Sequence, residues 1–298
     1  MQRFHGAYTA LVTPFSGEDC GRVDEQGFID LINFQIERGI HGLVPCGTTG
    51  ETATLSFDEH KRVIDLAVAT AAGRVPVIAG TGANSTSEAI EFSESAKKSG
   101  ADATLSVVPY YNKPSQEGIY QHFRKIAEQV DIPMFIYNVP GRTVADIAPE
   151  TVARLAEIPN IIGIKEAAGN LARISDLIRL CPSDFIVLSG DDFTALPSVC
   201  IGAKGLISVV SNIVPGRTAQ LLESALNGKL SRANELHYRL HPLMKCMFDY
   251  PSPAPVKMGA RLRGIIQNDM PRLPMDRLTE DNPTYGRLTE AMRGLGII

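Results

Sequence analysis

Short apolar runs alternate with longer amphipathic runs along most of the chain. The apolar runs are rich in Val, Ile and Leu and show little alternation with polar residues. Runs of this kind are typical of strands in a parallel sheet whose two faces are both covered. Eight strands are predicted from this pattern, at residues 7–14, 42–47, 76–82, 103–111, 133–140, 161–167, 185–192 and 205–212.

The runs between these strands carry helix start signals. Asp24, Ser85 and Ser115 each precede a helix-like run, Asp58 is the predicted start of a fourth, and Pro149 opens a fifth. A strand followed by a helix, repeated eight times, indicates parallel crossover units. Eight such units favour a closed (β/α)8 barrel, the TIM barrel. The alternative, an open doubly wound sheet, normally carries a Gly-rich dinucleotide fingerprint after its first strand, and none is present here.

The alternation ends after residue 228. Three helix-like segments follow without a strand between them, and the Pro-rich stretch 250–255 is typical of a rigid connector. We therefore predict a barrel over residues 1–228 and a C-terminal helical region over residues 229–298.

Composition narrows the class of protein. The chain has 298 residues, 44% of them hydrophobic and 21% charged, which is the range of globular proteins. A net charge of -4 offers no electrostatic case for binding nucleic acid. No apolar run reaches the roughly 18 residues that a membrane span needs, and the first residues lack a signal peptide's apolar region. The five cysteines are widely spaced and form no C-x-x-C pair, as expected of free thiols. These features predict a cytoplasmic protein.

Lys165 stands in the sixth of the eight apolar runs, residues 161–167, which also holds three isoleucines. Because a strand alternates its faces, Ile161, Gly163 and Lys165 should share one face, and Ile162 and Ile164 the other. We expect Ile162 and Ile164 to pack outward onto helices, and Lys165 to point into the barrel. Burial favours the neutral amine that a nucleophile needs, so this lysine is suited to forming a Schiff base with a ketone. The alternative is a lysine paired with a carboxylate at the barrel mouth.

Other polar groups stand at the C-terminal ends of strands, where barrel enzymes place their active sites. Tyr137 is expected to face inward, as a proton carrier or as a core residue. Arg142 is suited to holding a carboxylate, and the alternative is a solvated loop arginine. The sequence GTTGE at 47–51 offers two hydroxyls and free backbone N–H groups, either as a cradle for a small carboxylate or as an ordinary turn. His237 and His241 have a possible metal spacing, but no third ligand is evident, so we expect no metal.

Taken in order, GTTGE, PYYNKPSQEG, YNVPGRT, IIGIKEA, SGDD and GLISV resemble the dihydrodipicolinate synthase family, a group similar to class I aldolases that also includes N-acetylneuraminate lyase. The resemblance covers essentially the whole chain, including the stretch PAPVK and the RLP run at 272–274. It implies a barrel enzyme that condenses pyruvate with L-aspartate 4-semialdehyde in diaminopimelate and L-lysine biosynthesis, without a metal or organic cofactor.

The resemblance also implies roles for particular residues. Lys165 matches the Schiff-base lysine and Tyr137 the tyrosine that relays protons. Thr48 and Tyr111 match its relay partners, with Tyr111 supplied by a neighbouring subunit. The substrate-binding residues it implies are Thr49 for pyruvate, Arg142 for the carboxylate of the semialdehyde, and Gly190, Asp191 and Ile207 along the pocket.

Members of this family are commonly homotetramers, built as dimers of dimers, and many are inhibited by L-lysine. Positions that match the inhibitor site are Thr52, Ala53, Phe57, His60, Asn84, Glu88 and Tyr110. Phe57 departs from the histidine that well-inhibited bacterial members often carry, so we expect inhibition to be possible but weakened. Gly141 replaces a serine of several relatives, which should change loop flexibility more than chemistry.

Two rival functions differ from this expectation. A sialic acid lyase or sugar-acid aldolase of the same family would share Lys165 and Tyr137, but Arg142 and the pair Thr48–Thr49 favour the synthase. A non-catalytic binding protein could keep the barrel as a scaffold. No residue of the expected relay is lost, which argues against that second rival.

Overall fold

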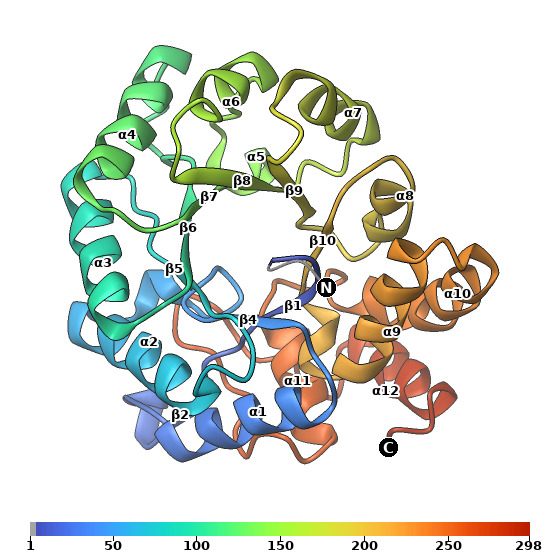
Figure 1. Cartoon of the computed structure of the whole chain (residues 1–298). Helices are drawn as coiled ribbons and strands as arrows, with labels where there is room; N and C mark the ends of the chain where they lie inside the picture. The colour runs from blue at the N-terminus through green and yellow to red at the C-terminus, as the bar shows by residue number, and fades with distance from the viewer. Residues whose placement is uncertain (1–3) are drawn as a thin grey trace.

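The computed structural model describes residues 4–298, and of residue 18 only the backbone. Figure 1 shows a ring of parallel strands surrounded by helices, with further helices beside the ring near the C-terminus. All eight predicted strands are present, and each is shorter than the apolar run that predicted it. They are β1 (Gly6–Ala10), β4 (Gly42–Val44), β5 (Ile78–Gly80), β6 (Ala103–Val107), β7 (Met134–Asn138), β8 (Ile161–Glu166), β9 (Ile186–Ser189) and β10 (Gly205–Ser208).

The strands close into a barrel. The sheet has the order β4-β1-β10-β9-β8-β7-β6-β5, and every adjacent pair is parallel. A parallel bridge between Leu43 and Val77 links the two edges, β4 and β5. The predicted TIM barrel with a C-terminal helical extension is therefore confirmed. The residues at the ends of the apolar runs leave the strands and form the loops that carry the candidate site.

Each barrel strand is followed by a helix that packs on the outside of the ring. These helices are α1 (Glu25–Glu37), α2 (Phe57–Ala71), α3 (Thr86–Ser99), α4 (Gln116–Gln129), α6 (Pro149–Leu155), α7 (Leu171–Leu180), α8 (Ala195–Cys200) and α9 (Pro215–Leu226). The additional elements are the hairpin β2 (Phe15–Ser16) and β3 (Arg22–Val23), the short helix α5 (Pro140–Thr143), the 3₁₀ turns η1 (Glu18–Cys20), η2 (Thr52–Thr54) and η3 (Val210–Asn212), and the C-terminal helices α10 (Leu230–Cys246), α11 (Ala254–Leu262) and α12 (Pro283–Gly294).

Four of the five predicted helix starts are found, and one is wrong. Asp24, Ser85 and Ser115 are N-caps, and Pro149 opens α6. Helix α2 begins two residues before the run that Asp58 was expected to cap, because Ser56 is its N-cap. The Ser56 hydroxyl accepts from the Glu59 N–H at 3.2 Å, and the Glu59 carboxylate accepts from the Ser56 N–H at 2.9 Å. This reciprocal capping box satisfies two free donors, which a cap at Asp58 would not do.

Strand β8 breaks the simple alternation that the sequence predicted. The register between β7 and β8 shifts between Met134 and Phe135, so that Ile162 is an extra residue in the strand. Ile161 therefore packs outward with Ile164 in the cluster under the helices, and Ile162 packs against the cluster inside the barrel. The predicted faces of Ile161 and Ile162 are wrong, because a bulge reverses the side-chain direction on one side of it.

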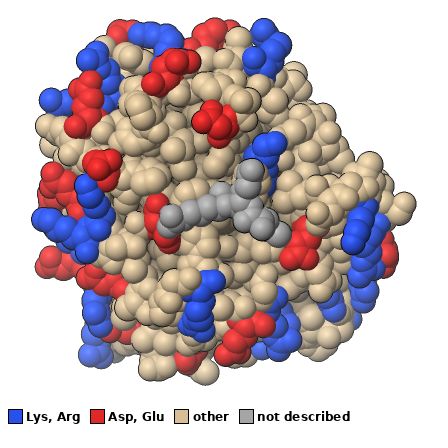
Figure 2. Space-filling model, in the orientation of Figure 1, with Lys and Arg blue, Asp and Glu red and all other residues tan. Residues whose placement is uncertain are grey.

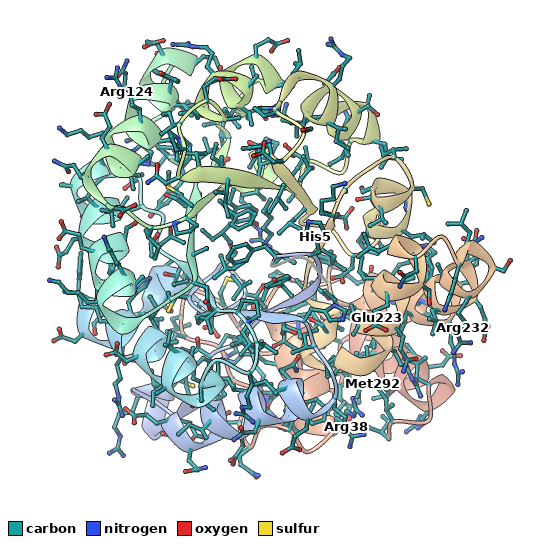
Figure 3. The ribbon with its side chains drawn as sticks, viewed as in Figure 1. His5, Arg38, Arg124, Glu223, Arg232 and Met292 are labelled. Carbon is teal, nitrogen blue, oxygen red and sulfur yellow. The ribbon has the colours of Figure 1, made fainter. Side chains whose placement is uncertain are left out.

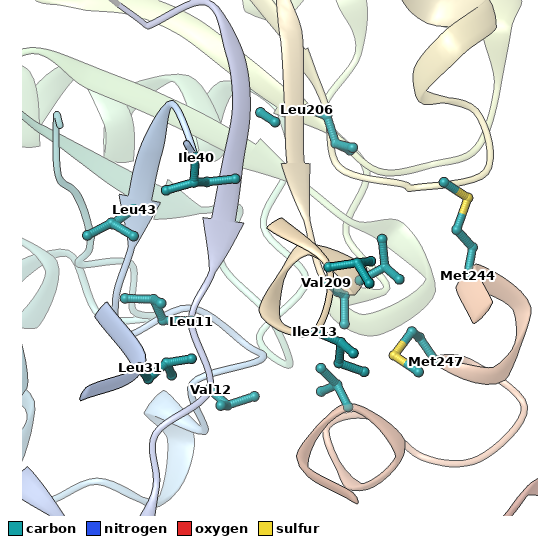
Figure 4. Packing of buried hydrophobic residues seen from close by; sticks show 14 of the residues in the cluster. Leu11, Val12, Leu31, Ile40, Leu43, Leu206, Val209, Ile213, Met244 and Met247 are labelled. Atoms are coloured by element: carbon teal, nitrogen blue, oxygen red, sulfur yellow. The ribbon is translucent and has the colours of Figure 1, made fainter. Parts of the chain in front are cut away.

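The C-terminal helices share a core with the barrel. One continuous cluster joins residues of β1, β4 and β10 with residues of α10, α11 and α12. Figure 4 shows Met244 and Met247 near Val209 and Ile213, at the end of β10. The boundary at residue 228 between the barrel and the C-terminal helical region stays a prediction. Residues on both sides of it are buried in the same hydrophobic core.

Figure 2 shows acidic and basic side chains interspersed over the visible face of the molecule. Within residues 4–298, no helix is both long enough and apolar enough to cross a bilayer.

Candidate active site

A cavity of about 400 Å³ lies at the C-terminal ends of the barrel strands. It brings together most of the site residues that the sequence predicted, from four different strand ends. Its lining residues are Thr48, Thr49, Tyr137, Val139, Gly141, Arg142, Lys165, Ala167, Gly190, Asp191, Phe193, Val209, Phe248 and Ser252.

Lys165 reaches this cavity from β8 and is only 7% exposed. Its Nζ lies 4.1 Å from the ring centroid of Tyr137, which stands beside it on β7. No carboxylate of the described residues forms an ion pair with Lys165. The neighbouring Glu166 points the other way, where its Oε2 accepts from Arg173 Nε at 2.7 Å. The alternative reading of Lys165 as half of a salt bridge is therefore wrong.

Glycines on both sides make room for this arrangement. A Cβ on Gly190 would lie 2.9 Å from Cε of Lys165 and 2.7 Å from Cβ of Ala167, so a larger residue would displace the lysine chain. A Cβ on Gly163 would lie 2.6 Å from the ring of Phe135, which fills the barrel below the site. The side chain of Lys165 thus packs against Gly190 on one side, and it lines the cavity.

Three residues with hydroxyl groups, Tyr137, Thr48 and Thr49, line the cavity. Tyr137 is 7% exposed and lies in the cluster inside the barrel, as predicted. Thr49 is buried and Thr48 is exposed, and both belong to the loop after β4. Tyr111 does not line the cavity and is 88% exposed. Within this one chain, the relay residues Tyr137 and Thr48 come together and Tyr111 stands apart.

Arg142 lies in the short helix α5, which places it at the exposed rim of the cavity. Its backbone N–H donates to the Val139 carbonyl at 2.9 Å, which fixes the turn that carries it. The guanidinium forms no ion pair within the described residues. A cation at the rim of a cavity that also holds an amine suits a substrate with a carboxylate.

The two aspartates after β9 do different things. Asp191 lines the cavity, and its carboxylate accepts from the Phe193 N–H at 3.1 Å and the Thr194 hydroxyl at 2.9 Å. Asp192 is buried and accepts from the Ser208 hydroxyl at 2.6 Å and from the Val209 N–H at 2.9 Å. Burial raises the pKa of Asp192 to about 6, although these hydrogen bonds oppose the rise. Asp192 therefore ties the loop after β9 to the end of β10.

Ile207 does not line this cavity. It is 1% exposed and packs inside the barrel with Tyr137. The sequence placed it by resemblance alone, and in the structure it contributes to the floor beneath the site.

A buried ion pair behind the loop after β4 was missed in the sequence. Lys257 Nζ lies 2.6 Å from Glu51 Oε1 and 4.2 Å from the ring centroid of Phe15, and it also donates to the Met270 carbonyl at 3.1 Å. The Arg272 N–H donates to Glu51 Oε2 at 2.8 Å. Burial lowers the pKa of Lys257, an effect that Glu51 opposes. The network anchors the GTTGE loop to the C-terminal region.

The only sign of this network in the sequence was the set of motifs that carried the family resemblance. Glu51 ends the GTTGE motif, and Lys257 and Arg272 lie in the PAPVK and RLP stretches that carried the family resemblance. Glu51 and Lys257 are 206 residues apart in sequence, so no local spacing could pair them.

The predicted inhibitor residues fall into separate surroundings. Ala53 and Tyr110 line a second cavity of about 320 Å³, which shares Thr48 and Arg142 with the first. Asn84 Nδ2 donates to the Tyr110 carbonyl at 3.2 Å, and Glu88 is exposed on α3. His60 is buried and does not line that cavity. Its ring centroid lies 4.0 Å from that of Phe92 in a tilted arrangement, and burial lowers the pKa of His60 to about 4.

His237 and His241 lie 5.7 Å apart between ring centroids on α10. No group of three or more metal-ligating side chains occurs among the residues that the structure describes.

Comparison with known proteins gives one consistent family. The model of the dihydrodipicolinate synthetase family matches residues 3–289. A curated 4-hydroxy-tetrahydrodipicolinate synthase from Desulfotalea psychrophila is 64% identical over 298 residues, which is 100% of this chain and 99% of the relative.

Solved structures agree with the sequence relatives. The chloride-inhibited dihydrodipicolinate synthase of Acinetobacter baumannii, complexed with pyruvate, is 44% identical with a TM-score of 0.95, and the match covers 99% of both chains. The enzyme of Cyanidioschyzon merolae with lysine bound is 38% identical, again at 0.95, over 100% of both chains. A monomeric dihydrodipicolinate synthase variant is 39% identical at 0.95, over 99% of this chain and 98% of that one.

Proposed function

The chain belongs to the dihydrodipicolinate synthetase family, and from that premise we propose that Lys165 is the nucleophile of its reaction. The activity is that of a 4-hydroxy-tetrahydrodipicolinate synthase, a lyase of the class I aldolase type in diaminopimelate and L-lysine biosynthesis. The observation that carries our assignment is a buried lysine amine that faces a cavity, beside a tyrosine ring, without an ion-pair partner among the described residues.

The proposed steps follow from the chemistry of an amine and a ketone. Lys165 Nζ adds to the carbonyl carbon of pyruvate, and loss of water gives a Schiff base. Loss of a methyl proton converts the Schiff base into an enamine, whose carbon attacks the aldehyde of L-aspartate 4-semialdehyde. The amine of the semialdehyde then attacks the carbon that was the carbonyl carbon of pyruvate, and it displaces Lys165 Nζ from that carbon. The heterocycle closes and the lysine is free again.

Tyr137 is proposed to move the protons of these steps. A phenol beside the amine can protonate the carbinolamine oxygen as it leaves as water, and can accept a proton in the reverse direction. Its ring centroid is 4.1 Å from Lys165 Nζ, which supports this role. Thr48 and Thr49 line the same cavity, where their hydroxyls suit the relay and the pyruvate carboxylate.

Arg142 is proposed to bind the carboxylate of the second substrate. Its position at the rim leaves the deeper part of the cavity to pyruvate and Lys165. Removal of this cation should raise the KM for the semialdehyde much more than the KM for pyruvate, because only the former would contact it.

One trapping experiment tests the nucleophile. The protein is incubated with pyruvate, reduced with borohydride, digested and analysed by mass spectrometry. We expect one adduct, on Lys165. An adduct on any other lysine, or none, contradicts the assignment.

A second assay separates the synthase from other aldolases that would share Lys165 and Tyr137. Turnover of pyruvate with L-aspartate 4-semialdehyde is compared with turnover of pyruvate with N-acetylmannosamine. We expect the first pair to react much faster, and faster turnover of the second pair would favour the lyase instead.

Tyr111 is proposed to complete the relay from a second copy of the chain, in a homo-oligomer that the sequence predicts to be a tetramer. Its 88% exposure leaves it free to enter a neighbour's site. One relative is described as a monomeric variant, so the oligomer needs a direct test. Inactive Tyr111→Phe protein is mixed with inactive Lys165→Ala protein. Partial recovery of activity is expected if the tyrosine acts across an interface, and no recovery would place it within its own chain or outside the relay.

L-lysine is proposed as an inhibitor, with Ala53, His60, Asn84, Glu88 and Tyr110 as its site. The second cavity supports this, since it reaches Thr48 and Arg142 of the first. Phe57 stacks on Phe92 at 4.7 Å instead of offering a polar group to a ligand. Phe57→His should lower the half-inhibitory concentration about three- to tenfold, the effect of one added hydrogen bond. No effect of millimolar L-lysine on the parent protein would contradict this proposal.

A cytoplasmic location also stays a proposal. Its support is that Cys20, Cys46, Cys181, Cys200 and Cys246 are all free thiols, as is usual in a reducing compartment.

A further inference from the structure

Three arginines converge on a cavity outside the catalytic site. The cavity has a volume of about 360 Å³ and lies where the end of α1 meets the first turn of α9, with Arg263 after α11 and Ile297 closing it. Arg38, Arg217 and Arg263 all line it, and it shares no residue with the catalytic cavity. In Figure 3, Arg38 lies at the lower edge of the molecule, below α9.

The positive charge of this cavity is not balanced by acidic groups. None of the three arginines forms an ion pair within the part of the chain that the structure describes. Glu37 is the one acid in the lining, and it is exposed and likewise unpaired there. The guanidinium carbons of Arg38 and Arg263 lie 5.7 Å and 5.1 Å from the centroid of the same ring, Phe34, so two cations flank one aromatic side chain.

Burial also disfavours the positive charge of two of these arginines. It lowers the pKa of Arg263, with further contributions from the charges of Arg38 and Arg217. It also lowers the pKa of Arg217, where the charge of Arg239 contributes. Guanidinium groups stay protonated at neutral pH, so both groups are partly desolvated cations, and Arg263 is also repelled by Arg38 and Arg217.

The cavity also holds hydrogen-bond donors without acceptors. Arg217 Nη2 donates to the Leu295 carbonyl at 2.8 Å, but its Nη1 is buried and has no partner among the described residues. Helix α9 begins here, and its N-cap, Val214, offers no side-chain acceptor to the first-turn N–H groups. The N-terminus of α9, which carries the positive end of the helix dipole, therefore lies at the same cavity as the three arginines.

We propose that this cavity, lined by Arg38, Arg217 and Arg263, binds a small oxyanion with two or more negative charges, of the phosphate class. Such an ion accepts several charge-assisted hydrogen bonds from guanidinium groups at once. Phosphate also suits a helix N-terminus. The source can be inorganic phosphate or the phosphate group of a monoester, since both present the same oxygens. Bound there, the anion would join α1, α9, α11 and the segment after α12.

The test measures thermal unfolding and isothermal titration of the full chain with inorganic phosphate, and separately with glycerol 3-phosphate. Chloride at the same ionic strength is the reference, because it screens charge without offering several oxygens. We expect saturable binding of phosphate and a higher unfolding midpoint than in chloride. Binding of the monoester as well would assign an open site that takes phosphate esters, whereas binding of phosphate alone would assign an enclosed one.

Arg38→Gln is the most informative variant, because no hydrogen bond of the Arg38 side chain is lost with it. Arg217→Gln removes the buried donor itself. Each should weaken phosphate binding at least about tenfold, the usual effect of losing one charged hydrogen bond. Arg124→Gln on α4 is the matched control, since Figure 3 shows Arg124 at the opposite edge of the molecule, and it should bind phosphate like the parent.

A second control excludes the catalytic cavity as the phosphate site. Arg142→Gln should leave the phosphate-dependent shift unchanged. The proposal is overturned if chloride gives the same shift, if Arg38→Gln and Arg217→Gln bind as tightly as the parent, or if Arg142→Gln abolishes binding.

Discussion

Lys165 and Lys257 are both buried lysines beside an aromatic ring, but only Lys257 has an acidic partner among the described residues and only Lys165 lines the candidate cavity. Lys257 is fully buried, with Glu51 Oε1 2.6 Å away, the Met270 carbonyl at 3.1 Å and the Phe15 ring beside it. Lys165 has a tyrosine ring beside it, a cavity before it and no acid partner in residues 4–298. Burial alone therefore does not make a lysine a nucleophile. A free lone pair needs an amine that no carboxylate holds protonated, and room for a substrate.

Removal of Lys165 should give the largest effect. Lys165→Met is expected to lower kcat at least about 10³-fold, because the covalent route is lost. Its unfolding free energy should stay within about 1 kcal/mol of the parent value, because Lys165 makes no side-chain ion pair or hydrogen bond with the described residues. Steady-state kinetics and urea unfolding measure the two quantities. A variant with substantial synthase activity would show that the contrast between the two lysines has no catalytic meaning.

The reverse pattern is expected for Lys257. Lys257→Met should lower the unfolding free energy by about 3–5 kcal/mol, because Glu51 remains buried without its counter-ion. The double variant with Glu51→Gln should recover much of that loss, since the amide oxygen can still accept from the Arg272 N–H. Urea unfolding of the three proteins measures this. Equal losses in the single and double variants would mean that packing, not charge, holds the GTTGE loop.

Tyr137→Phe sharpens the difference on the catalytic side. It keeps the ring beside Lys165 and removes only the hydroxyl. We expect kcat to fall about 10²- to 10³-fold, the usual contribution of a proton-transfer group, while borohydride still traps pyruvate on Lys165. The trapping reaction is the control, because it requires the lysine but not a fast relay. Loss of trapping as well would mean that the hydroxyl is needed to place the lysine.

His60 is a third buried basic side chain. It lines neither of the two cavities near the site and has no acidic partner among the described residues, so it tests the effect of burial alone. Burial lowers its pKa from 6.5 to about 4, so the unfolded chain takes up a proton at a higher pH than the folded chain does. The contribution of His60 to stability should therefore be full above pH 6.5 and decline as the pH falls from 6.5 towards 4, with a loss of about 2 kcal/mol from His60 alone at pH 5.

Urea unfolding between pH 7.5 and 5 measures this loss. His122 behaves alike, because burial also lowers its pKa to about 4. His60→Phe, which can keep the ring contact with Phe92, should remove about half of the pH dependence. An unchanged dependence in this variant would mean that His60 does not titrate as its burial requires.

Much of the candidate site could be predicted from sequence because each proposed catalytic group is local to one strand end. Lys165, Tyr137, Arg142 and the threonine pair stand directly after apolar runs, and the barrel brings such ends together. The faces of the first residues in β8 were less predictable. The bulge at Ile162 depends on the pairing of β8 with β7, and alternation within β8 alone assigns two isoleucines to the wrong faces.

The sequence by itself determined the order of strands and helices, the barrel, and the place of Lys165 at a strand end, since these follow from periodicity and from residues close together in the chain. The tertiary structure decided whether Lys165 was free or paired, which partner held Lys257, and that Arg38, Arg217 and Arg263 face one cavity. These outcomes depend on contacts between residues far apart in the chain, such as Glu51 and Lys257, which are 206 positions apart. No local pattern records such contacts, because burial and pairing are set only when the chain closes on itself.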